Sequence, residues 1–240
     1  MKTLVAALAF AQFVVPFGPR LLGWGQDIGR RASENGLPSP ETPAGYAFSI
    51  WFPIFVLGIV YAIRLWRAPA DTRLAPLAPF AAVMFAAGTA WMLWTQLVGS
   101  SVVQLATIYA MYAATMLGAA RVASGDRPSA ALFGLQGGWL TAAICLNTTS
   151  YVREFAGATP FGLAPETYAL FTLVPATLLA LATILARRAN AWFAGAFAWA
   201  LIGVAAANLA GENDLRDLAL GALLAVLAAH FAARGKERTP

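Results

Sequence analysis

Long apolar runs separated by short polar breaks dominate the chain. A first run extends from Thr3 to Phe17, and apolar residues return at 21–24. Further apolar segments follow at about residues 45–66, 76–98, 101–122, 129–151, 166–186, 190–209 and 215–233. At 1.5 Å per helical residue, each of these is long enough to cross a bilayer core of about 30 Å. The pattern therefore predicts an all-α fold, a polytopic transmembrane helix bundle of about eight spans.

The first run contains Pro16 and Pro19, which predict a kinked first helix. Its charged start and the small residues around Phe10 would also suit a cleaved signal peptide. Because apolar residues return at 21–24, we favour the kinked span and leave cleavage open. Residues 25–41 are rich in Gly, Pro and Ser and form the longest predicted loop of the chain.

The second segment begins with aromatic residues and prolines. Residues 42–53 read TPAGYAFSIWFP, which places Tyr46, Phe48 and Trp51 where the chain enters the membrane. Tyrosine and tryptophan are common at membrane surfaces, so an interfacial aromatic belt is one interpretation. The other is that these rings face a cavity, and this stretch alone does not decide between the two.

Composition supports a membrane protein. Of the 240 residues, 60% are apolar and 11% are charged, and the mean hydropathy is +0.66. A soluble domain has about 25% charged residues. The net charge of +5 is spread over short loops, which argues against nucleic-acid binding. A single cysteine, Cys145, and a single histidine, His230, predict neither a disulfide framework nor a metal site.

Basic residues lie mostly on one side of the predicted spans. With eight spans, both termini lie on the same side of the membrane. The basic residues on that side are Lys2, Arg64, Arg67, Arg73, Arg121, Arg127, Arg187, Arg188, Arg234, Lys236 and Arg238. The opposite side has Arg20, Arg30, Arg31, Arg153 and Arg216. The positive-inside rule then places both termini in the cytoplasm, and the 25–41 loop outside. We expect the membrane to be a bacterial-type inner membrane.

No Asp, Glu or Lys lies deep within a predicted span. A charge at mid-bilayer costs about 2.5–3.5 kcal/mol and usually marks an ion or proton pathway, so a proton-coupled transporter is disfavoured. Ser, Thr and Cys occur in the spans without the neighbouring His or carboxylate that activates a nucleophile. The sequence therefore argues against an enzyme, without excluding one, and it requires no cofactor.

Aromatic and amide side chains gather in the third and fifth segments. Trp91 and Trp94 share a helix face in the third segment. In the fifth, an arc of about 80° holds a polar–aromatic–small–polar stripe, made of Gln136, Trp139, Ala143 and Asn147. Such a stripe should face protein or a cavity, because an unpaired amide costs several kcal/mol in lipid. Interhelical hydrogen bonding and a ligand pocket both explain it.

Small residues suggest where helices pack. Gly134 and Gly138 let another helix approach closely, either within the chain or in a homodimer. The last three segments contain Ala-rich runs at 179–186 and 191–207, which offer little polar chemistry. We expect these three segments to provide packing or partner contacts rather than the ligand site.

Three motifs, in order along the chain, resemble the TspO/MBR family of tryptophan-rich sensory or translocator proteins. Residues 43–51, PAGYAFSIW, are similar to the family's P-x-G-W-x-F…W, although the spacing before Trp51 differs by one residue. Trp94-Thr95 resembles its W-[ST], although Trp91 replaces the family's asparagine nearby. Residues 139–147, WLTAAICLN, match its W-x-x-x-A-x-x-L-N.

The resemblance covers roughly residues 1–152 and implies a TspO/MBR-like five-helix block there. Residues 153–240 would add three transmembrane helices and a short basic tail. The resemblance also implies an aromatic cavity under the first loop that binds a porphyrin or, in some members, a sterol or isoprenoid. Members often form dimers, so a homodimer stays open.

Together, the stripes and the resemblance predict a sensor, receptor or transporter for a flat apolar ligand, with the lipid bilayer and that ligand as its partners. A bound tetrapyrrole is the favoured ligand. The expected ligand-binding residues are Tyr46, Phe48, Trp51, Trp91, Trp94, Gln136, Trp139, Ala143 and Asn147. The alternative is a structural or assembly subunit of a membrane complex with no small-molecule ligand.

The charge asymmetry generates a topology prediction. Reporter fusions after Pro240 and within the 25–41 loop should report opposite sides of the membrane, with the Pro240 fusion in the cytoplasm. A Pro240 fusion that is active only outside would contradict the number of spans.

Overall fold

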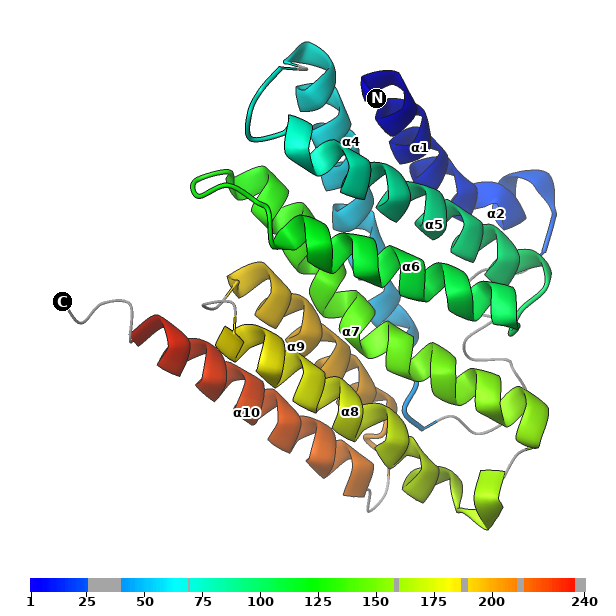
Figure 1. Ribbon diagram of the computed structural model, residues 1–240. Coiled ribbons are helices and arrows are strands. Elements are labelled where there is room, and N and C mark those ends of the chain that lie inside the picture. The colour runs from blue at the N-terminus through cyan, green and yellow to red at the C-terminus, as the bar shows by residue number, and fades with distance from the viewer. Residues whose placement is uncertain (26–39, 69, 158–159, 187–189, 211–213, 236–240) are drawn as a thin grey trace.

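The computed structural model of the protein describes residues 1–25, 40–68, 70–157, 160–186, 190–210 and 214–235. All regular elements in these residues are helical. The longer helices are α1 (Lys2–Val14), α4 (Trp51–Arg67), α5 (Ala78–Leu97), α6 (Val102–Ala119), α7 (Arg127–Ala156), α8 (Pro165–Ala186), α9 (Ala191–Ala207) and α10 (Asp214–Gly235) (Figure 1). Short elements accompany them: η1 (Val15–Phe17), α2 (Gly18–Leu22), η2 (Gly45–Ile50), η3 (Ala75–Leu77) and η4 (Pro160–Gly162).

The prediction of an all-α transmembrane bundle is confirmed. Within the described residues, six helical stretches are long and apolar enough to cross a bilayer. Two shorter apolar helices, Lys2–Phe17 and Ala191–Ala207, accompany them. The first helix breaks where expected, since Pro16 lies in η1 and Pro19 in α2.

The helix α7 extends further than its apolar pattern predicts. It continues past residue 151 to Ala156, and Gly157, with φ 88°, ends it. Glycine adopts positive φ without a steric cost, which suits it to stop a helix. The added turn carries Arg153, whose position matters for the site described below.

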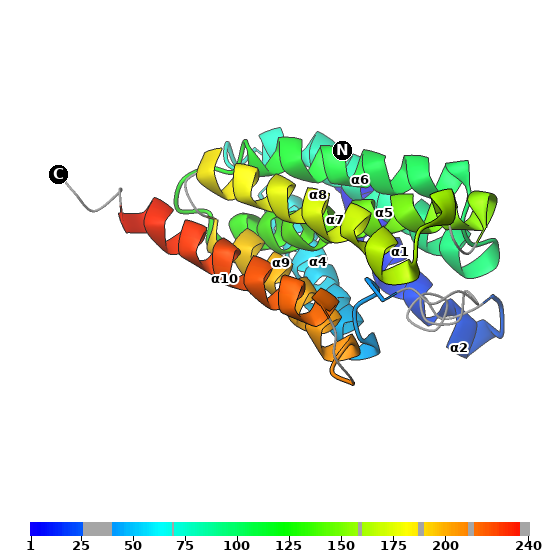
Figure 2. The ribbon, with the colours of Figure 1, turned by 90° about the horizontal axis from the view of Figure 1, so that it is seen from below.

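The helix α7 is also the centre of the bundle. It packs against α4, α6, α8 and α9, and in Figure 1 it runs between the α5–α6 pair and the C-terminal helices. The helix α10 packs on α8 and α9, and it lies on the side of them that faces away from α5 (Figure 2).

Two hydrophobic clusters fill the interior. The larger lies mainly among α1, α4, α5, α6 and α7 and includes the buried residues Phe85, Met111 and Phe133. The smaller lies among α8, α9 and α10 and includes Phe197. Ala142 of α7 contacts both clusters and so connects them. The division of the chain at residue 152 stays a prediction.

Glycines on α7 allow α9 to approach within the chain. A Cβ added at Gly138 would overlap the carbonyl oxygen of Phe193 and lie 2.9 Å from Ala196 Cβ. A Cβ added at Gly134 would lie 2.8 Å from the Cβ of Trp192. The small-residue pair of the sequence therefore lets α7 and α9 pack closely within the chain.

Ion pairs and aromatic contacts place the helix ends in two groups. At one end, Arg64 Nη1 lies 2.9 Å from the buried Asp126 Oδ1, and Lys2 Nζ lies 5.3 Å from the Trp66 ring centre. These contacts bring the start of α1, the end of α4 and the start of α7 together. The opposite end holds Arg153, as the alternation of spans requires.

The glycine contacts generate a stability prediction. Gly138→Ala should lower the free energy of unfolding by about 1–3 kcal/mol, because α9 must shift away from α7. Gly195→Ala is the matched control, since nothing lies within 4 Å of a Cβ at Gly195, and alanine favours the helix. Thermal unfolding in detergent measures both. Equal stability of the two variants would contradict close packing at Gly138.

Candidate functional site

Residues 40–48, which we call the roof segment, lie over one end of the bundle and are fixed mainly by α9. Asn208 Nδ2 donates to Pro40 O at 2.7 Å, and Ala44 N donates to Gly203 O at 2.9 Å. Trp199 Nε1 donates to Ala47 O at 2.8 Å. These bonds give partners to backbone groups of the roof segment, as buried backbone groups require.

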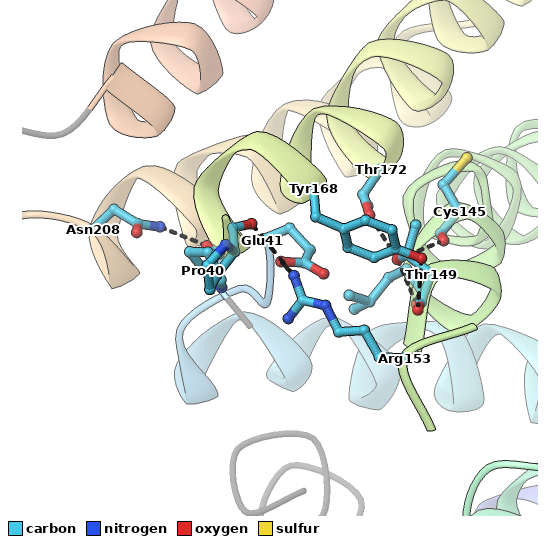
Figure 3. A network of polar contacts seen from close by, with 10 residues as sticks. Pro40, Glu41, Cys145, Thr149, Arg153, Tyr168, Thr172 and Asn208 are labelled. Atoms are coloured by element: carbon cyan, nitrogen blue, oxygen red, sulfur yellow. Dashed lines mark hydrogen bonds and ion pairs between the residues drawn. The ribbon is translucent and has the colours of Figure 1, made fainter. Parts of the chain in front are cut away.

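A buried ion pair fixes the roof segment from a second direction (Figure 3). Arg153 Nη2, in the last turn of α7, lies 3.4 Å from Glu41 Oε2, and the two side chains are 3% and 0% exposed. The same nitrogen donates to Pro165 O at 3.4 Å. The Arg153 guanidinium also lies 4.9 Å from the centre of the Tyr168 ring. Arg153 thus joins α7, the start of α8 and the roof segment.

Beneath the roof segment lies a cavity of about 110 Å³. Its walls come from the roof segment, from α4 to α9 and from the turn between α5 and α6. The apolar part of the lining includes Phe48, Trp51, Trp91, Trp139, Leu173 and Phe197. Charged and polar side chains, including Glu41 and Arg153, line it near the roof. The arrangement matches the usual small-molecule site, which has mostly apolar walls and a few polar groups.

Aromatic rings in the cavity wall pack against one another. Trp51 stacks on Trp91 with ring centres 5.8 Å apart and an interplanar angle of 29°. Trp139 meets Trp51 edge to face at 6.2 Å, and Phe48 meets Trp139 edge to face at 5.6 Å. Such pairs contribute about 0.5–1.5 kcal/mol each beyond buried area. The cluster is therefore part of the core as well as part of the cavity wall.

Asn147 connects α7 to α5. Its Oδ1 accepts a hydrogen bond from Trp91 Nε1 at 3.1 Å, and its Nδ2 donates to Ala143 O at 2.8 Å. Asn147 also lines the cavity. The two interpretations of the α7 stripe, interhelical bonding and cavity wall, therefore apply to the same residue.

The structure brings six of the nine sequence-predicted residues to the cavity, namely Phe48, Trp51, Trp91, Trp139, Ala143 and Asn147. The other three do not line it. Tyr46 is 48% exposed and packs edge to face on Trp199. Trp94 is half-buried, and Gln136 is buried one turn before Trp139. Neither the Trp94 indole nitrogen nor the Gln136 amide has a hydrogen-bond partner in the described part of the chain.

Two of the last three segments, all of which were expected to provide packing or partner contacts rather than the ligand site, help to form the cavity. Thr172, Leu173 and Ala176 of α8 line it, as do Phe197, Ala200, Leu201 and Val204 of α9. Small residues at two of these positions leave space that larger side chains would fill. From the sequence, we interpreted the Ala-rich runs only as a lack of polar chemistry. Small side chains opposite the polar–aromatic stripe of α7 could have indicated that these helices leave space for a cavity.

The polar groups of the site are suited to binding a ligand. Among the described residues, no group of three or more His, Cys, Asp or Glu side chains could hold a metal ion. Its polar groups include the amides of Gln104 and Asn147, hydroxyl groups such as Thr95, and the charged side chains of Glu41, Arg153 and Glu154. These groups can orient a ligand by hydrogen bonds and charge.

The Trp91–Asn147 hydrogen bond generates a testable prediction. Asn147→Leu should lower the free energy of unfolding by about 1–2 kcal/mol, because the Trp91 N–H then loses its partner inside the bundle. Trp91→Phe removes the donor, and a double-mutant cycle of the two changes in detergent isolates the coupling. Thr107→Val on the exposed surface of α6 serves as the control. Additive effects of the two changes would show that the bond contributes no stability.

Comparison with known proteins identifies the family. A family model described as TSPO-like protein matches residues 4–233, a range that includes α8, α9 and nearly all of α10. No curated protein and no solved structure matches the chain. With its apolar helices, the match establishes an integral membrane protein. Because the family model covers nearly the whole chain, the protein belongs to the TSPO-like family.

Proposed function

We propose that this membrane protein binds a flat apolar ligand in the cavity beneath the roof segment, and acts as a sensor or a transporter of it. A tetrapyrrole is the favoured ligand class, with a sterol or isoprenoid as the alternative. The observation that carries the proposal is the aromatic wall formed by Phe48, Trp51, Trp91 and Trp139 in a cavity whose lining is mostly apolar. Both termini would lie in the cytoplasm, in a bacterial-type inner membrane.

The size of the cavity sets a condition on binding. Small-molecule sites usually measure about 300–1,000 Å³, whereas this cavity measures about 110 Å³. A tetrapyrrole therefore needs one wall to move. Within the described residues, 40–44 form a part of the wall outside regular helices. They are held by polar contacts and by the packing of the buried Pro43 near Gly203 of α9, so their displacement would disrupt no helix.

A structural or assembly role is the competing function. The packing of the aromatic rings on one another and the Trp91–Asn147 bond favour it, since both are used inside the protein without a ligand. Under this alternative, the cavity is a packing defect and the exposed helix faces bind partner proteins.

Tryptophan substitutions separate the two functions. Trp139→Leu should weaken porphyrin binding several-fold, because it keeps an apolar side chain but removes the ring that can stack on the ligand. Trp94→Leu and Trp192→Leu are controls that should leave affinity unchanged, since neither residue lines the cavity. Titration of a porphyrin, followed by quenching of the remaining tryptophans, measures affinity in each folded variant. Loss of stability in Trp139→Leu with unchanged affinity would favour the assembly role.

A further inference from the structure

The two ends of the cavity differ in chemistry. Tryptophan and phenylalanine side chains line the part deeper in the bundle. The part under the roof segment is lined by three charged residues, Glu41, Arg153 and Glu154. A ligand that matches both parts has an apolar body and a charged or strongly polar group at one edge.

Arg153 is a fixed cation at the charged end. Its side chain is 3% exposed, and contacts from Pro165 and Tyr168 of the α8 region hold it in place (Figure 3). A guanidinium stays protonated at any physiological pH. A buried cation of this kind is strongly unfavourable without an anion beside it. Any state in which Arg153 stays buried, including a ligand-bound state, must therefore supply a negative group beside it.

Glu41 supplies that anion in the present structure, and it comes from the segment that must move. The Nη2–Oε2 distance of 3.4 Å is longer than the 2.7–2.9 Å of a tight charge-assisted hydrogen bond. Glu41 belongs to the irregular start of the roof segment, whereas Arg153 belongs to a 30-residue helix. If the roof segment is displaced, Glu41 moves to solvent with it and Arg153 stays at the cavity.

We propose that Arg153 binds a carboxylate of the ligand, which replaces Glu41 when the roof segment opens. The exchange keeps one anion beside the guanidinium in both states, so no buried charge is left unpaired. The inference rests on the proposed function and narrows its ligand class to a flat apolar molecule with a carboxylate at its edge. Carboxylated tetrapyrroles belong to this class, whereas uncharged sterols and isoprenoids do not. Glu154 is exposed, so solvent screens its repulsion of the ligand.

A matched pair of probes tests the assignment on the full chain in detergent. Protoporphyrin IX carries two carboxylates, and its dimethyl ester has the same ring without the charges. Wild-type protein should bind the acid roughly tenfold more tightly than the ester, because only the acid forms a charge-assisted contact. Glu41→Gln should bind the acid more tightly than wild type, because no roof carboxylate competes for Arg153.

The double variant Glu41→Gln/Arg153→Gln removes both charges, so it leaves no unpaired buried ion and should fold. It should bind the acid and the ester equally. Arg216→Gln, which breaks an exposed pair with Asp217, is the charge-matched control and should keep the wild-type preference.

The outcomes separate the two proposals. The role of Arg153 is overturned if wild type binds both probes equally, or if the double variant still prefers the acid. Either result leaves the proposed function intact. Binding of neither probe to wild type overturns the proposed function, and the role of Arg153 with it. Loss of the preference in the Arg216→Gln control would mean that overall charge, not Arg153, selects the acid.

Discussion

The close approach of α9 to α7 is the constraint on which the site depends. It requires glycine at 138, where the carbonyl of Phe193 occupies the space of a side chain. Because α9 lies this close, its other half reaches the roof segment and forms one cavity wall. A methyl group at position 138 would push α9 away from α7. We expect this shift to break the Ala44–Gly203 hydrogen bond and to open the cavity wall at Ala200. The helices α8 and α9 are therefore part of the cavity wall.

The roof segment illustrates how backbone outside the long helices finds hydrogen-bond partners at the end of the bundle. Carbonyl and amide groups at Pro40, Ala44 and Ala47 pair with groups of α9 and its C-cap residue Asn208, because buried backbone groups need partners. Buried Pro43 and Ala47 also pack close to Gly203 of α9, so the segment is held by side-chain packing as well as by these bonds. Under the proposed function, displacement of residues 40–44 would let the small closed cavity admit a larger ring.

The sequence predicted the helices and most of the aromatic wall, because periodicity and motif spacing act over short distances along the chain. Trp139, Ala143 and Asn147 share a helix face by spacing alone, and all three reach the cavity. Periodicity does not say how far a cavity extends along a helix face. Gln136 was therefore predicted as a ligand-binding residue, although it lies one turn beyond the residues of α7 that line the cavity. The Glu41–Arg153 pair joins residues 112 positions apart, and no local pattern relates them.

Interhelical bonding and ligand binding at Asn147 are compatible. The described contacts use one of the two lone pairs on Oδ1 and one of the two hydrogens on Nδ2. The remaining lone pair and hydrogen can serve a ligand in the cavity that Asn147 lines. Because Trp91 already orients the amide, a ligand would not have to order it, and this lowers the entropic cost of binding. The bond that stabilises the bundle thus also prepares the cavity wall.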